Sequence, residues 1–198
     1  MEVYITSIFY WAIMKSSRGF TIWELIVVMS IVAILTSLLI PGYTARTQQR
    51  RSEVIAAQIQ DVIQYARGEA MRRGTTVIIC GANYRVNDSL HGCQGSGNKS
   101  DWSEGILAYV DESANSQYSS GERVKAMRFD TDVVSPATVT LPIGILSIKP
   151  DSTLFGCNGE SCIFTLTQVI NSSVKESKLK VNLYGYGSFC RVGEDSAC

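Results

Sequence analysis

Apolar and polar positions along the chain follow three different patterns, and each pattern predicts a different element. Residues 20–40 form an almost continuous apolar run, FTIWELIVVMSIVAILTSLLI, in which Glu24 is the one charged residue. At about 1.5 Å per residue, a helix of this length is about 30 Å long, which matches the hydrocarbon core of a membrane. The run is too long for the apolar region of a cleaved secretory signal. We therefore expect a transmembrane helix over residues 20–40.

The second pattern begins after Pro41 and Gly42, which we expect to break the helix. Over residues 41–73, apolar side chains recur every three or four positions, as on one face of an amphipathic helix; they are Ile55, Ile59, Val62, Ile63, Ala66 and Ala70. Arg72 and Arg73 suit the last turn of such a helix. We expect its apolar stripe to lie on the rest of the chain. The alternative is a plain single-pass anchor followed by a separate amphipathic helix.

Residues 74–198, here called the head, alternate between apolar and polar positions in the way that is typical of β-strands. Stretches rich in Gly, Ser and Asn separate the alternating segments. We predict six strands, over 75–81, 105–111, 122–130, 137–144, 161–167 and 178–187. The predicted fold is therefore α+β, with a long N-terminal α-helix packed on an antiparallel β-sheet or small two-sheet sandwich.

The net charge indicates no binding partner, because 18 Lys and Arg balance 18 Asp and Glu. The distribution of the charges does predict how the chain is oriented in the membrane. Lys15 and Arg18 precede the apolar run, so the positive-inside tendency predicts a cytoplasmic N-terminus and a head on the outer side of the membrane. The head carries ten Lys or Arg against thirteen Asp or Glu, unlike the basic surface of a nucleic-acid binder. A loose basic cluster is interleaved with acidic residues and indicates a solvated surface; it comprises Lys175, Lys178, Lys180 and Arg191.

All six cysteines lie in the head. An even number confined to one segment predicts disulfides in an oxidising compartment, such as the periplasm. Among the fifteen possible pairings, short loops favour Cys80–Cys93, Cys157–Cys162 and Cys190–Cys198. Zinc is the alternative, but no Cys-x-x-Cys pair occurs and His91 is the only histidine, so the usual ligand spacings are missing.

No enzyme chemistry is indicated. His91 lies in a Gly- and Ser-rich segment, without a recognisable nucleophile or a pair of carboxylates beside it. Four oxygen-bearing residues are of the types that bind calcium, but their spacing fits no EF-hand and favours a solvated hairpin; they are Asp111, Glu112, Asn115 and Glu122. We therefore predict no catalytic residue, no metal and no cofactor.

Four features lie within the apolar run or next to it: a basic leader ending in Gly19, an aromatic Phe20, Glu24 five positions past the glycine, and Pro41. Together they resemble a type IV prepilin or pseudopilin. The resemblance implies that residues 1–19 are a leader, that a prepilin peptidase cuts between Gly19 and Phe20, and that Phe20 is N-methylated. The subunit then leaves the inner membrane for a helical filament.

The carboxylate of Glu24 needs a partner, because a charge in lipid costs a few kcal/mol. The α-amine that cleavage creates at Phe20 is the expected partner, and if it belongs to a neighbouring subunit the pair sets the register of assembly. The alternative is that Glu24 reaches the lipid headgroups.

Within the head, "VIICGAN", then Cys93, then "DWSEGILAYVDE" and "GERVKAMRF" are similar to the GspH/FimT family of minor pilins and pseudopilins. The terminal "GYGSFCRVGEDSAC" is similar to the closing disulfide loop of that family. The resemblance implies a structural subunit near the filament tip that helps to prime a type IV pilus or a type II secretion pseudopilus; the six cysteines slightly favour the pilus. Its implied partners are the peptidase, other minor and major pilins, and the inner-membrane assembly platform.

Two departures from the family pattern matter. Members that capture DNA carry Gly-Arg-x-Arg before the final loop, whereas this chain has Gly187-Ser188-Phe189-Cys190-Arg191. A DNA- or surface-binding tip pilin is therefore the alternative function, with few cations to contact phosphates. In addition, residues 4–14 are mostly apolar, whereas family leaders are short and polar. Translation from Met14 gives the leader MKSSRG, so we expect Met14 to be the true start.

Overall fold

The structure is a computed structural model that describes residues 19–84, 89–112, 115, 117–129, 138–157, 159–170 and 172–191, with the backbone alone for residues 38–49. The chain divides into two compact units, Met1–Thr44 and Ala45–Cys198. The leader up to Arg18, with its expected start at Met14, lies outside the described residues.

Helix α2 (Ile22–Arg73) begins in the first unit and is helical at Pro41 and Gly42, so the predicted break at these two residues is wrong. A proline removes one backbone hydrogen bond, whereas the leucines and isoleucine before it favour the helix. Within the apolar run, the hydroxyl groups of Ser30 and Ser37 donate hydrogen bonds to carbonyl oxygens one turn earlier, both at 2.7 Å. These polar side chains are therefore satisfied by their own helix.

Residues 20–37 of the apolar run are exposed in the structure of this single chain. Phe20 is 82% exposed and Trp23 is 73% exposed. Across the residues whose side chains are described, no helix combines the length and the hydropathy that crossing a membrane requires. The span over residues 20–40 stays a prediction.

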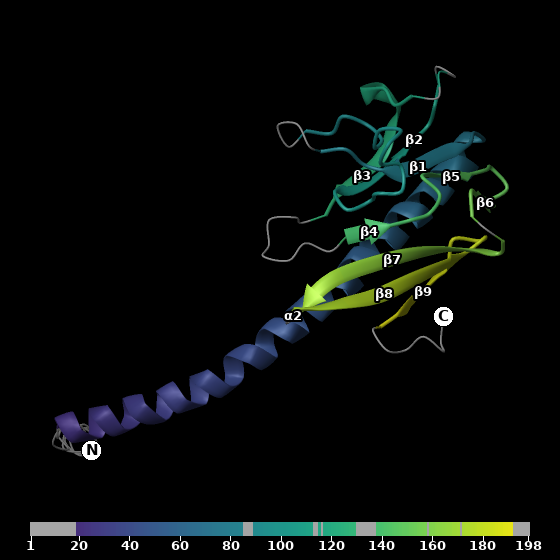
Figure 1. Ribbon diagram of the computed structural model, residues 1–198. Coiled ribbons are helices and arrows are strands. Elements are labelled where there is room, and N and C mark those ends of the chain that lie inside the picture. Colours follow the sequence, from purple (N-terminus) through teal and green to yellow (C-terminus); the bar gives the residue numbers. More distant parts are fainter. Residues whose placement is uncertain are drawn as a thin grey trace, which may run out of the picture. The chain divides into compact units, whose positions relative to one another are not determined.

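The second unit contains two antiparallel sheets, which Figure 1 shows with the strand labels. One sheet has the order β3-β2-β1-β5-β6 and the other has the order β4-β7-β8-β9. The strands are β1 (Val77–Gly81), β2 (Gly105–Tyr109), β3 (Arg123–Arg128), β4 (Thr138–Thr140), β5 (Ile145–Ile148), β6 (Leu154–Phe155), β7 (Ser161–Ile170), β8 (Ser173–Asn182) and β9 (Gly187–Cys190), with a 3-10 helix η1 (Ser120–Glu122) before β3. The predicted α+β class and antiparallel pairing are confirmed.

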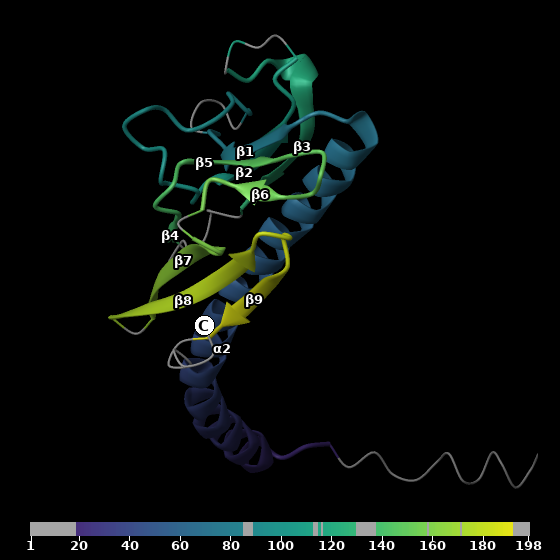
Figure 2. The same ribbon diagram turned by 90° about the vertical axis from the view of Figure 1, so that its right-hand side faces the viewer.

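The main core lies between both sheets and the second half of α2, which runs along the sheets in Figure 2. The predicted helix stripe is buried throughout, with exposed fractions of 5% or less for Ile55, Ile59, Val62, Ile63, Ala66 and Ala70. Burying a large aliphatic side chain contributes about 1.5–3 kcal/mol. The stripe therefore holds this part of α2 on the head, as its spacing predicts.

The segment Asp101–Gly105, which carries the Asp-Trp-Ser-x-Gly motif, connects the two sheets. Trp102 is fully buried, and its ring packs edge-on against Phe164 of β7 with 5.3 Å between centroids. The backbone N–H of Trp102 donates to the carbonyl of Val139 in β4 at 2.8 Å. The carboxylate of Asp101 accepts a hydrogen bond from the N–H of Ser103 at 2.9 Å, which fixes the turn. This motif is therefore architectural.

A smaller apolar cluster covers the other face of the first sheet, around Cys80, Leu107 and Tyr109. The Cys80–Cys93 disulfide attaches the following loop to this face, and Tyr118 packs edge-on against Tyr109. Both faces of the sheet are thus covered, which explains why β2 is buried along its whole length.

Candidate functional site: the first turn of α2 and the head surface

The predicted processing site lies immediately before α2. Gly19 and Phe20 precede the helix and are exposed, and a Cβ atom at Gly19 would meet no atom within 4 Å. Cleavage and methylation of these residues stay predictions.

Glu24 lies in the first turn of α2 and forms a reciprocal cap with Thr21. Its Oε2 atom accepts hydrogen bonds from the N–H of Thr21 at 3.0 Å and from the Thr21 hydroxyl at 3.1 Å. The Thr21 Oγ1 atom accepts a hydrogen bond from the N–H of Glu24 at 3.2 Å. This is a capping box, and its Thr-x-x-Glu signature was overlooked in the sequence. The carboxylate is also favoured by the helix dipole, which is positive at this end.

The described disulfides follow the predicted pairing by short loops. Cys80 is bonded to Cys93 and Cys157 is bonded to Cys162. Cys190 is disulfide-bonded as well, while its predicted partner Cys198 lies outside the described residues.

The structure does not bring the four basic candidates together on one face. Side chains alternate between the faces of a strand, so Lys175 lies on the opposite face of β8 from Lys178 and Lys180. Arg191 is paired with Glu53 of α2 at 2.7 Å. The four residues therefore do not form one basic surface.

A network of hydrogen bonds attaches the turn between β8 and β9 to α2. The Gln64 side-chain amide donates to the carbonyl of Gly185 at 2.6 Å, and Arg67 donates to the carbonyl of Tyr184 at 2.7 Å. The Arg67 guanidinium also lies over the Tyr186 ring at 5.5 Å. Sequence reasoning missed these contacts, which join residues more than 110 positions apart.

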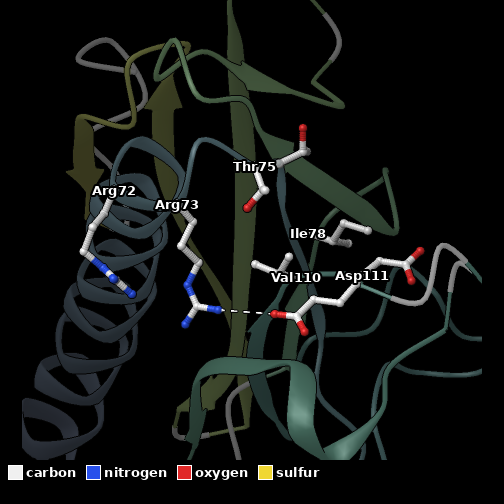
Figure 3. A pocket seen from close by; sticks show the side chains of 8 residues that line it. Arg72, Arg73, Thr75, Ile78, Val110 and Asp111 are labelled. Atoms are coloured by element: carbon white, nitrogen blue, oxygen red, sulfur yellow. Dashed lines mark ion pairs between the residues drawn. The ribbon is translucent and has the colours of Figure 1, made fainter.

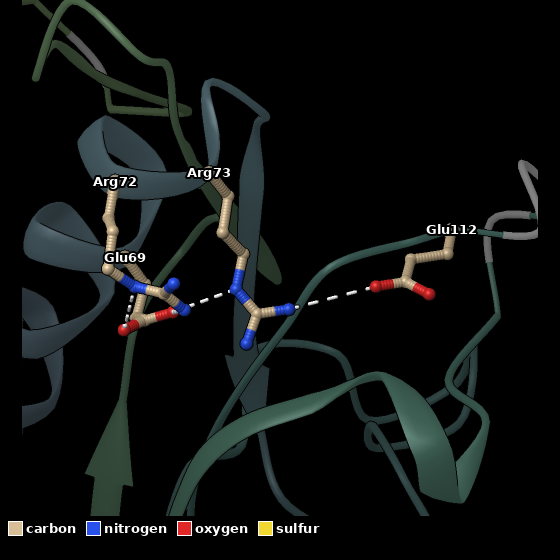
Figure 4. Close-up of polar contacts among 4 residues, drawn as sticks. All are labelled: Glu69, Arg72, Arg73 and Glu112. Carbon is tan, nitrogen blue, oxygen red and sulfur yellow. Dashed lines mark hydrogen bonds and ion pairs between the residues drawn. The ribbon is translucent and has the colours of Figure 1, made fainter.

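An open groove lies where α2 ends and β1 begins (Figure 3), lined by Arg72, Arg73, Thr75, Thr76, Ile78, Val110, Asp111 and Glu112. Figure 4 shows the charges on its helix side: Glu69 accepts hydrogen bonds from Arg72 and from Arg73, each with a contact of 2.7 Å. Arg73 also pairs with Glu112 at 3.7 Å. The hydrogen bonds from Arg72 and Arg73 lower the pKa of Glu69 to about 2.

Both arginines of the groove, Arg72 and Arg73, have a carboxylate partner in Glu69. The ion pair between Arg73 and Glu112 connects the end of α2 to the segment after β2. Across the described residues, no three His, Cys, Asp or Glu side chains are gathered as a metal site.

Comparison with known proteins identifies the family. The family described as type II transport protein GspH matches residues 56–185, and the prokaryotic N-terminal methylation motif matches residues 14–40. The chain therefore belongs to the GspH family. Its class is that of the minor pilins and pseudopilins of type II secretion and type IV pili, which are structural proteins and not enzymes. Members are processed by prepilin peptidase, anchored in the inner membrane and assembled with other pilins.

Individual relatives are more distant. The type IV wide pilus major component PilA4 of Thermus thermophilus is 35% identical over 52 residues, which are 26% of this chain and 40% of that protein. Two crystal structures of the type IV minor pilin FimU of Pseudomonas aeruginosa are also similar. One has a TM-score of 0.43 at 17% identity, covering 69% of this chain and 90% of that one. The other has a TM-score of 0.46 at 16% identity, covering 74% and 91%.

Proposed function

We propose that this chain is a minor subunit at or near the tip of a type IV filament, where it helps to prime assembly after prepilin peptidase has cut between Gly19 and Phe20. The observation that carries the proposal is the position of Glu24, in the first exposed turn of α2 and four residues after the new N-terminus. A cut at Gly19 places an α-amine on Phe20, and a carboxylate is the natural partner of an amine in an apolar environment. The GspH family assignment supports the filament role.

The capping box gives this proposal a specific order of events. Before assembly, the N–H and hydroxyl of Thr21 hydrogen-bond the Glu24 carboxylate. During assembly, the Phe20 amine of an adjacent subunit becomes a charged partner for the same carboxylate. Glu24 is therefore never left without a partner as it moves from the membrane into the filament.

Two variants separate the charge of Glu24 from its capping role. Glu24→Gln keeps a side chain that suits a capping box but removes the charge, whereas Thr21→Ala removes the cap and keeps the charge. The proposal predicts that Glu24→Gln is processed normally and is lost from sheared filaments. The Thr21→Ala variant should also be processed, and it should enter filaments to a larger extent than Glu24→Gln. Normal incorporation of Glu24→Gln into filaments would refute the pairing of Glu24 with the Phe20 amine. If Thr21→Ala is lost from filaments to a larger extent than Glu24→Gln, the role of Glu24 is capping alone.

The arrangement of basic residues gives the DNA-binding alternative no support. Lys175 is separated from Lys178 and Lys180 by the sheet, and Arg191 is paired with Glu53. Retention of DNA by the purified chain that weakens with added salt would restore that alternative.

A further inference from the structure

The end of the β7–β8 hairpin carries exposed apolar side chains at a place where polar residues are usual. This segment, here called the hairpin end, comprises residues 169–170 and 172–176. Val169 is 50% exposed and Val174 is 65% exposed, and they lie directly opposite each other in the register of the two strands, so their side chains are neighbours on one face. A strand position that faces away from the core is normally polar. Neither valine belongs to an apolar cluster of the head, so the packing of the head does not account for this pair.

The hairpin end projects from its sheet as a two-stranded ribbon. β4 pairs with β7 only as far as Thr167, and β9 pairs with β8 only from Lys178 onward. Beyond these residues, β7 and β8 pair with each other, and both views show this end extending past β4 and β9 (Figures 1 and 2). β8 is exposed without interruption over residues 173–176. The hairpin end is therefore open to contact with another surface.

The hairpin end points back toward the beginning of α2. The turn between β8 and β9 is bonded to Arg67 of α2, whereas Arg191, immediately after β9, is paired with Glu53. Following β9 away from that turn therefore leads back along α2. The residue before Arg191 lies opposite Lys178 of β8. From Lys178, the strand continues to Ser173, about 16 Å farther in the same direction.

This direction brings the hairpin end close to the predicted membrane surface. Glu53 follows Ile40, where the predicted span ends, by about 20 Å of helix. The hairpin end extends back over as much as about 16 Å of that length, and the headgroups occupy about 5–7 Å on each side of the hydrocarbon core. Residues 41–52 contain three arginines and no acidic residue; of these, Arg50 is exposed, as is Lys175 of the hairpin end. Apolar side chains combined with cations suit a membrane surface that contains anionic phospholipids.

We infer that the hairpin end is a second membrane contact of this chain: Val169 and Val174 enter the headgroup layer, and Lys175 and Arg50 bind the phosphate groups of anionic phospholipids. Two valines and a few cations bind a bilayer weakly and reversibly compared with a transmembrane helix. The contact therefore orients the head while the subunit is anchored, and it is released when the subunit leaves the membrane. The inference goes beyond the proposed function and rests on the predicted span over residues 20–40.

The test uses the full, uncleaved chain in vesicles of phosphatidylethanolamine and phosphatidylglycerol, so it does not depend on filament assembly. A photo-crosslinking amino acid at Val169 should form adducts with phospholipid, which mass spectrometry detects. The matched control places the same amino acid at Ile163, which is 43% exposed on the same face of β7 and lies about 20 Å farther from the hairpin end. The control should form far fewer phospholipid adducts.

A second measurement tests the cations. Lys175→Gln should lower the yield of phospholipid adducts from Val169 by up to about fivefold, because one basic residue near an anionic surface contributes about 1 kcal/mol. Lys149→Gln, in the exposed turn before β6, should leave that yield unchanged. The inference would be overturned by equal yields from Val169 and Ile163, by adducts from Val169 only with protein, or by an unchanged yield for Lys175→Gln. A chain that does not float with the vesicles would refute the span together with the inference, whereas phospholipid adducts from a chain that never enters filaments would refute the proposed function alone.

Discussion

Replacing Gly81 by alanine is expected to destabilise the head by forcing β1 away from the Asp-Trp-Ser motif. A Cβ atom at Gly81 would lie 2.4 Å from the backbone oxygen of Asp101 and 3.2 Å from two atoms of Trp102. Cβ contacts in proteins stay above 3.0 Å, so the backbone at Asp101 has to move. That movement stretches the hydrogen bond from Trp102 to Val139 and disturbs the buried indole.

The expected magnitude follows from these contacts. Overpacking costs about 1–3 kcal/mol and a weakened hydrogen bond about 1 kcal/mol, which gives about 2–4 kcal/mol in total. For a unit of this size, each kcal/mol lowers the melting temperature by about 2–4 °C. We therefore expect Gly81→Ala to melt about 4–16 °C below the wild type.

Circular dichroism of the purified full chain in detergent measures this difference. Gly97→Ala is the matched control, because a Cβ atom at Gly97 meets nothing within 4 Å, and it should melt within about 1 °C of the wild type. If Gly81→Ala also melts within about 1 °C of the wild type, the close contact between β1 and the Asp-Trp-Ser motif does not contribute to the stability of the head.

Three further predictions concern the core, the charge cluster and a disulfide. Ile59→Ala removes a fully buried side chain and should lower the free energy of unfolding in urea by about 2–5 kcal/mol; a loss below about 1 kcal/mol would contradict the packing of α2. The pKa of Glu69 lies below its usual 4.5, at about 2. The stabilisation from its arginine partners is therefore present above pH 4.5 and is lost as the pH falls toward 2; an NMR titration midpoint near 4.5 would contradict it. Replacing Cys80 and Cys93 by serine opens a loop closed over 13 positions and should cost about 3 kcal/mol of unfolding free energy in urea; an unchanged midpoint would contradict a structural role.

The parts of the fold that could be predicted are those in which apolar residues recur at a regular spacing along the chain. Ile59 and Val62 belong to a stripe whose helical spacing is visible in the residues themselves, and all six predicted strand segments contain part of a strand. The segment over 178–187 was predicted as one strand, but it contains the end of β8 and a turn in which Gly185 has a φ of +76°. β5, β6 and β9 were missed because they are short and lack a clear alternation.

The site was only partly predictable. Glu24 could be identified from the sequence because a charge inside an apolar run is costly. Its hydrogen bonds with Thr21 could also have been predicted, because Thr-x-x-Glu is the signature of a capping box, but this signature was overlooked. The contacts of Gln64 and Arg67 with the β8–β9 turn join distant positions and leave no local signal. The predicted break at Pro41 failed because propensity at one residue did not outweigh the helix formers around it.

The most direct test of the account is the N-terminal peptide of this chain recovered from purified filaments. Mass spectrometry should find a peptide that begins at Phe20, carries one added methyl group and ends before the head. The corresponding N-terminal peptide of the Glu24→Gln variant should be present in the membranes of cells that make it but missing from their filaments. A chain that keeps residues before Phe20, or that is never recovered with filaments, would contradict the central claim that it is a processed filament subunit.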